Sequence, residues 1–238
     1  MLLQKLQDIE TQIRTLEIKK AALHEENEKR EQVISGWEAE HEVRNVVGKF
    51  SIYYSAGEYS KAFELFSCTD QVYLQISDQG IYEGRKAVKA CFEQLTKTAV
   101  PGSFRYMPVT SEIVEVSKDL KTAQGMWFIN GCAAIKDSED PLVPAADLWL
   151  EDKLAVELIR ENGRWAILRM NINEEMRAEY HKSWGDYAED PSYPDFDRYA
   201  EPTRGATRHH PFRADRKSGK NLTTPEPYAG YNDLADHY

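Results

Sequence analysis

Proton transfer is the chemistry for which this sequence carries suitable side chains. Asp147 precedes the apolar segment 148–150, and Glu157 stands within the apolar segment 154–159. Burial in such surroundings raises the pKa of a carboxyl group toward neutrality, where it can act as a general acid or base. His181 lies beyond the last expected strand, and imidazole already titrates near neutral pH. Asp147, Glu157 and His181 are therefore the candidate catalytic residues; a loop-end hydrogen bond for Asp147 and a solvent-facing place for Glu157 are open alternatives.

Side chains that can hydrogen-bond to a substrate oxygen or stack on a ring stand in the same segments. They are Tyr54, Tyr73, Tyr82, Trp127, Asn130 and Trp149. Core packing is the competing interpretation for all of the aromatic residues. For Asn130 the sequence does not separate a functional role from a structural one.

Arg169 and Asn171 alternate along one expected strand and share one of its faces with Trp165 and Ile167. A buried arginine needs a carboxylate partner, and Glu157 on the adjacent strand of the hairpin can supply it. Such a pair either binds an oxyanion of the substrate or braces the sheet. Alternation alone does not decide which face of the strand lines a cavity.

Metal and cofactor sites are not expected. Cys68, Cys91 and Cys132 are far apart and form no CxxC motif, so neither a disulfide framework nor a zinc site is indicated. The adjacent His209 and His210 have no third ligand at a suitable spacing. This cysteine usage is typical of a reducing cytoplasm.

Composition limits the partners. The 238 residues are 41% hydrophobic and 29% charged, enough for a globular core, and the formal net charge is -10. An acidic chain is a poor match for nucleic acid or for an anionic membrane surface. No apolar run is long enough to span a bilayer, and the first residues lack the core of a signal peptide. We expect a cytoplasmic protein that binds neither nucleic acid nor membrane.

Three parts of the chain must position the candidate residues, and the central one is 42–176. Helical periodicity is expected at 43–54, 59–66 and 85–96, and strands at 72–76, 106–116, 122–134, 146–160 and 164–172. The turn at 79–84 feeds a helix, and Glu161-Asn162-Gly163 suits a tight hairpin. This order predicts an α+β domain in which a curved mixed sheet packs on three helices and encloses a pocket.

The first part, 1–41, has the spacing of a coiled coil. Apolar residues recur at alternating intervals of four and three, at Leu2, Leu6, Ile9, Ile13, Leu16, Leu23, Ile34 and Trp37. Polar residues at three further seam positions can set register and strand number. We expect an oligomerisation helix that forms a dimer or a trimer. A helix folded back on its own domain is the alternative.

The third part, 177–238, combines prolines with regularly spaced aromatic residues. Prolines prevent long regular elements, whereas disordered tails are usually poor in aromatic residues. We expect an extended arm whose rings pack on the domain or on a neighbouring copy, and so contribute to self-association. Disorder is the alternative.

The central part resembles the SnoaL-like family of the nuclear transport factor 2-like superfamily. The resemblance rests on Tyr54 with Glu58-Tyr59, on Gly80-x-Tyr82-x-Gly84 before a helix, on Lys121-Thr122-Ala123, and on Gly163-Arg164-Trp165. It implies a cone-shaped α+β fold with a hydrophobic cavity. Polyketide cyclases, scytalone dehydratase and ketosteroid isomerase share this fold, and many members transfer protons without a cofactor.

The resemblance gives Tyr54 the place of an active-site tyrosine, but the rest of the dehydratase pattern is changed. Ser55 stands where that enzyme has an aspartate, and Met107 and the neighbourhood of Cys132 stand where it has histidines. The expected asparagine falls near Leu154.

Two kinds of function follow. The first is a cofactor-independent lyase, dehydratase or isomerase that acts on a small hydrophobic, aromatic or cyclic substrate. The second is a noncatalytic ligand-binding or assembly module, which the missing histidines and the long coiled-coil pattern favour. A subunit like the small one of ring-hydroxylating dioxygenases fits less well with the long helix and the arm.

Overall fold

The computed structural model describes residues 1–136, 138–186, 199–207, 211–212 and 223–230. Two compact units divide the chain, Met1–Ala39 and Glu40–Tyr238. Helix α1 (Leu2–Ser55) contributes residues to both units. None of the helices among these described residues has an apolar stretch of the length that a membrane span requires.

Within Met1–Ala39, the apolar residues of the coiled-coil pattern are exposed. Leu6, Ile13 and Leu23 have exposed fractions of 57%, 49% and 59%. Polar positions of the same helix pair along it, as in the ion pairs Lys29–Glu25 and Arg30–Glu26, which are four residues apart. This unit therefore offers an apolar stripe that no side chain of the unit covers.

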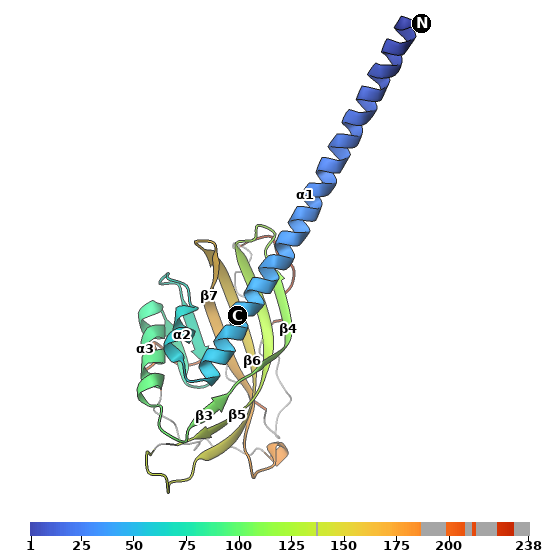
Figure 1. The fold of residues 1–238 in the computed structure, drawn as a ribbon. Coiled ribbons are helices and arrows are strands. Elements are labelled where there is room, and N and C mark those ends of the chain that lie inside the picture. Colours follow the sequence, from blue (N-terminus) through green and yellow to red (C-terminus); the bar gives the residue numbers. More distant parts are fainter. Residues whose placement is uncertain (137, 187–198, 208–210, 213–222, 231–238) are drawn as a thin grey trace. The chain divides into compact units, whose positions relative to one another are not determined.

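The second unit is a mixed α+β domain built on a curved seven-stranded sheet (Figure 1). Its other helices are α2 (Tyr59–Glu64), α3 (Arg85–Lys97) and the 3-10 turn η1 (Trp184–Asp186). Its strands are β1 (Tyr73–Ile76), β2 (Gly80–Glu83), β3 (Phe104–Tyr106), β4 (Val109–Val116), β5 (Thr122–Ile135), β6 (Ala146–Glu161) and β7 (Arg164–Glu179). The order is β2-β1-β7-β6-β5, and β3 and β4 both pair with the far edge of β5. Strands β1 and β7 are parallel, whereas the other described strand pairs are antiparallel.

Local sequence explains these boundaries. Gly57, with a φ of 72°, lies in the turn that follows the end of α1. Asn162 and Gly163, with φ of 50° and 77°, form the tight turn between β6 and β7. The expected single strand at 106–116 is divided into β3 and β4 at Pro108, which has no N–H to donate to a ladder. The segment expected to be only a turn at 79–84 contains β2, because it returns antiparallel along β1.

The core lies between the helices and the sheet. The carboxyl-terminal turns of α1 bury Val43, Val47, Phe50 and Tyr54, and α3 buries Val88, Cys91, Phe92 and Leu95 at helical spacing. Helix α3 packs on α2 and on the short strands β1 and β2. The rings of Phe50, Phe66 and Phe92 join these elements, with centroids 5.6–6.4 Å apart.

Described segments of the carboxyl-terminal part lie against the sheet. Arg204 forms an antiparallel bridge with Ile81 of the edge strand β2. The Ile81 N–H donates to Arg204 O, and the N–H groups of Thr203 and Arg204 donate to Ile81 O. Tyr228 donates through its hydroxyl to Thr122 Oγ1 at 2.9 Å. Residues 187–198, 208–210, 213–222 and 231–238 of the expected arm lie outside the described residues.

Candidate active site

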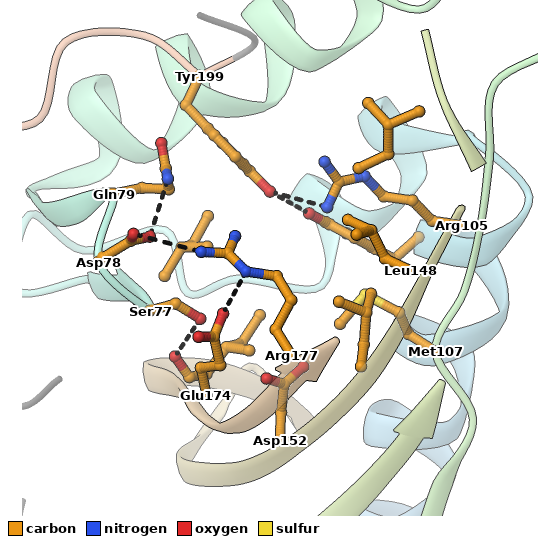
Figure 2. A pocket seen from close by; sticks show the side chains of 15 residues that line it. Ser77, Asp78, Gln79, Arg105, Met107, Leu148, Asp152, Glu174, Arg177 and Tyr199 are labelled. Carbon is orange, nitrogen blue, oxygen red and sulfur yellow. Dashed lines mark hydrogen bonds and ion pairs between the residues drawn. The ribbon is translucent and has the colours of Figure 1, made fainter. Parts of the chain in front are cut away.

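A small cavity of about 60 Å³ opens within the second unit (Figure 2), and we call it the polar cavity after the charged groups in its otherwise largely apolar lining. Its functional groups come from five elements that are distant in the sequence. They are Tyr54 from α1, Arg105 from β3, Asp152 from β6, Glu174 and Arg177 from β7, and Tyr199 from the carboxyl-terminal segment. The turn between β1 and β2 adds Ser77, Asp78 and Gln79 to the lining.

Strand alternation places the carboxyl groups in the cavity. Leu148, Leu150 and Asp152 line it from every second position of β6, and Ile172 and Glu174 line it from β7. Asp152 is the cross-strand partner of Glu174. Two carboxyl groups thus share one face of the β6–β7 ladder.

A register shift in β7 brings Arg177 to the same face. Asp152 pairs with Glu174, whereas the preceding Glu151 pairs with Met176, so one extra residue stands on β7. Residues three apart in a regular strand point to opposite faces, and a bulge re-aims the side chain that follows it. Arg177 Nε consequently lies 3.2 Å from Glu174 Oε2. Its Nη2 lies 3.7 Å from Asp78 Oδ2. Figure 2 marks both ion pairs of Arg177 with dashed lines.

Burial changes the protonation of both carboxyl groups. Asp152 is 5% exposed and Glu174 is 4% exposed. Burial, reinforced by the charge of Glu174, raises the pKa of Asp152 well above its ordinary value. Burial also raises the pKa of Glu174, to about 7, against the opposing effect of Arg177. Glu174 can therefore accept or release a proton near neutral pH, and Asp152 holds its proton more firmly than an ordinary aspartic acid does.

Glu174 is also incompletely bonded. One of its oxygens faces Arg177, but Oε1 is buried and has no hydrogen-bond partner among the described residues. A buried carboxylate oxygen without a partner is costly, which makes it a receptive acceptor for a proton or donor of a bound molecule.

The other side of the cavity carries hydroxyl groups and a second arginine. The hydroxyls of Tyr54 and Tyr199 are 3.1 Å apart, and Arg105 Nη1 donates to the Tyr199 hydroxyl at 3.2 Å. Burial, followed by the proximity of Tyr199, raises the pKa of Tyr54 well above its ordinary value. Tyr54 thus remains a hydroxyl that can donate a hydrogen bond.

Two residues that depart from the dehydratase pattern contact each other. Met107 N–H donates to Ser55 Oγ at 3.0 Å, and Ser51 Oγ donates to Met107 O at 2.7 Å. These bonds join the end of α1 to the link between β3 and β4. Ser55 therefore has a structural partner where the dehydratase pattern has a catalytic aspartate.

Of the candidate residues named from the sequence, Tyr54 lines this cavity. Asp147 and Trp149 alternate with the lining residues Leu148 and Leu150, so they lie on the opposite face of β6 and are exposed. Trp149 stacks on Tyr180 at 5.9 Å, and the exposed His181 contacts the same ring. None of these three residues lines the cavity.

The other aromatic candidates and Asn130 form hydrogen bonds or packing contacts with other residues of the protein and do not line the cavity. Tyr73 donates to Gln75 Oε1, and the fully buried Tyr82 donates to Ala200 O at 2.8 Å. Trp127 is 2% exposed and lies over Gly125, where an added Cβ would be 2.2 Å from the indole ring. Asn130 is exposed and bonds to Thr110 and Glu151.

Glu157 and Arg169 form an ion pair, but away from the cavity. Glu157 Oε2 lies 3.7 Å from Arg169 Nε across the β6–β7 ladder. Burial raises the pKa of Glu157 to about 7, and Arg169 opposes this rise. Asn171 is buried on the same strand as Arg169, and neither lines the cavity with Ile172 and Glu174. In this arrangement the pair links β6 to β7 outside the cavity.

Sequence reasoning missed Asp152, Glu174, Arg177, Arg105 and Tyr199. Glu174 and Arg177 follow Ile172, where the apolar alternation that predicted the strand ends. Asp152 stands between two charged residues, a pattern typical of a solvated segment. A usable signal was the length of β6, since an antiparallel partner as long as β6 must continue past Ile172.

Among the described ranges, no group of three or more His, Cys, Asp or Glu side chains could hold a metal ion. His209 and His210 lie outside those ranges. The ionisable groups of the cavity, the carboxyl groups of Asp78, Asp152 and Glu174 beside two arginines, suit proton transfer and anion binding.

Solved structures with the same fold exist, although no protein-family profile and no curated protein matches the sequence. A proposed scytalone dehydratase from Novosphingobium aromaticivorans DSM 12444 superposes with a TM-score of 0.50 at 15% identity, covering 64% of this chain and 94% of the other. A hexachlorocyclohexane dehydrochlorinase, LinA type 2, gives 0.51 at 11% identity, covering 67% and 98%. Another LinA structure gives 0.52 at 11%, covering 67% and 99%. At these identities the likeness shows a shared fold.

Proposed function

We propose that this chain, which has the nuclear transport factor 2-like fold, is a cofactor-independent lyase or isomerase that acts by proton transfer on a small hydrophobic, aromatic or cyclic substrate. Glu174 is the general base in this proposal, and Asp152 is the acid. The observation that carries it is the buried Glu174 carboxyl, whose pKa is raised to about 7 and whose Oε1 has no partner among the described residues.

The geometry supports one sequence of proton movements. The Glu174 carboxylate removes a proton from a carbon next to a carbonyl group, and its second oxygen stays on Arg177. The Tyr54 hydroxyl donates a hydrogen bond to the carbonyl oxygen, on which negative charge develops. In an elimination, the protonated Asp152 gives its proton to the leaving oxygen, and the pair then returns to its first state by passing one proton from Glu174 to Asp152. In an isomerisation, Glu174 returns the proton to another carbon.

The likeness to the dehydrochlorinase and to the proposed dehydratase supports an elimination, because the first name denotes loss of hydrogen chloride and the second denotes loss of water. The cavity of about 60 Å³ admits only the reacting part of a substrate, so the apolar remainder must lie outside it.

Proton exchange tests the function even while the natural substrate is unidentified. A panel of cyclic ketones such as 1-tetralone, together with their 3-hydroxy derivatives, is incubated with the full chain in deuterium oxide. We expect at least one ketone to lose its α-proton signal in NMR faster with protein than without, and its hydroxy derivative to lose water. If no compound exchanges faster but ligands still bind, the noncatalytic binding module is the better account.

We also propose that Met1–Ala39 pairs with the same helix of other copies, as a dimer or trimer. The exposed apolar stripe at heptad spacing supports this, because an isolated helix does not retain such a stripe in water without a partner. The double change Leu6→Glu and Ile13→Glu is expected to reduce the mass in light scattering to that of one chain. Ile18→Glu is the matched control: Ile18 is 71% exposed but lies off the stripe. An unchanged mass in the double variant would place assembly elsewhere in the chain.

A further inference from the structure

Arg105 lies between the polar cavity and a second, larger cleft. The cleft measures about 390 Å³, and Arg105 and Ile135 line both spaces. Most of the other cleft residues are apolar or small, among them Ala56, Tyr59, Leu95, Phe104 and Ala134. The cleft has the size and character of a site for the body of a cyclic molecule.

The charge of Arg105 is not balanced in the way that of Arg177 is. Arg177 has Glu174 and Asp78 within 4 Å. Arg105 has no carboxylate at that distance among the described residues, and the one hydrogen bond of its guanidinium group there goes to the Tyr199 hydroxyl. A guanidinium group carries five N–H donors, and this hydrogen bond uses one of them. The charge of Asp152, in the same cavity, acts on Arg105, but Asp152 is not at ion-pair distance among the described contacts. A guanidinium group without an ion-paired carboxylate is costly to bury unless an anion joins it.

We propose that Arg105 binds the carboxylate of an aromatic or alicyclic carboxylic acid, whose ring lies in the larger cleft. The planar guanidinium group can bind a carboxylate through two parallel hydrogen bonds. The carbons next to that carboxylate then stand at the boundary of the polar cavity, on the side of Tyr54. This inference names the substrate class of the proposed enzyme and rests on the proposed function.

Binding of a matched pair of probes tests the inference on the full chain. The pair is 2-naphthoate and 2-naphthamide, which have the same ring and differ in charge. We expect the wild-type chain to bind the acid at least about tenfold more tightly than the amide in calorimetry, as for hydrogen bonds to charged groups. Arg105→Gln should bring the ratio to about one and leave amide binding within about twofold.

Arg164→Gln is the matched control, because Arg164 is an exposed arginine at the start of β7 and should not affect the ratio. Circular dichroism establishes that Arg105→Gln is folded; if it is not, Arg105→Lys keeps the charge, loses the paired geometry and should give an intermediate ratio. Equal binding of both probes, no saturable binding of either, or a preference that survives Arg105→Gln would overturn the inference.

The test separates the two proposals. Protein-dependent α-proton exchange without a preference for the acid removes the carboxylate site and leaves the enzyme. A preference that depends on Arg105, without exchange on any compound, keeps the carboxylate site and removes the enzyme.

Discussion

Replacing Glu174 by Gln is expected to slow proton abstraction by about 10²- to 10⁴-fold, the usual contribution of a positioned general base. An amide has nearly the same shape as the carboxyl group and can still contact Arg177, but it cannot accept a proton. The effect should appear in kcat, with little change in KM, because Glu174 contacts the reacting atoms only. The measurement is α-proton exchange or water loss, by NMR, on the best compound of the panel.

Glu179→Gln is the matched control. Glu179 is on the same strand but pairs with Lys182 in an exposed ion pair, and it does not line the cavity. Its exchange rate should equal that of the wild type. A Glu174→Gln variant that retains the fold in circular dichroism and more than about a tenth of the wild-type rate would remove Glu174 as the general base.

Replacing Glu157 by Gln is expected to raise the free energy of unfolding at pH 8 by about 3 kcal/mol. The folded-state pKa of Glu157 is about 7, above its ordinary value of 4.5. Each unit of difference is worth about 1.4 kcal/mol. Glutamine has no charge to bury, and Arg169 loses little because its side chain is 46% exposed.

The sign of this effect sets its pH range. The folded state holds the proton more tightly than the unfolded state, so wild-type stability falls as pH rises from about 4.5 to about 7 and then levels off. The two proteins should therefore differ at pH 8 and agree at pH 4. Urea unfolding of both proteins at pH 8 and at pH 4 measures the difference in their free energies of unfolding. Glu83→Gln, which loses an exposed pair with Arg204, should change stability by less than about 1 kcal/mol. A Glu157→Gln variant that is no more stable than wild type at pH 8 would contradict this account.

The fold was largely predictable because its turns and periodicity are local signals. Asn162-Gly163 needs positive φ at both residues, and the structure has the tight β6–β7 turn there. Helix α3 follows from the helical spacing of Val88, Cys91, Phe92 and Leu95. Strand β2 was harder to predict, since a strand of four residues is too short to show a clear alternation of apolar and polar residues.

The site was less predictable because its geometry depends on a register shift. Alternation along β7 would send Glu174 and Arg177 to opposite faces, and the extra residue opposite Glu151 and Asp152 reverses that. A sequence does not show where a ladder takes an extra residue. Tyr199 reaches the cavity from a segment 145 residues away from Tyr54, which no local pattern connects. Tyr54 could be predicted because it lies at the end of a helix that the sequence marks with Gly57.

Glu157 has features of a catalytic carboxyl group although it lies away from the cavity. It stands in an apolar segment and has a raised pKa, as a catalytic carboxyl would. Like Glu174, it has an arginine beside it and one buried oxygen without a partner among the described residues, so only its position outside the cavity lining separates it from Glu174. A raised pKa becomes a functional signal only where a cavity accompanies it.

Titration of the Glu174 carboxyl tests the central claim most directly, and it needs no substrate. Carbon-13 NMR of glutamate-labelled protein follows each side-chain carboxyl with pH, and comparison with Glu174→Gln assigns the Glu174 signal. The account predicts a midpoint near pH 7 for that signal. A midpoint near the ordinary value of 4.5 would show that Glu174 is a plain carboxylate at neutral pH, and would contradict the assignment of this cavity as an acid-base site.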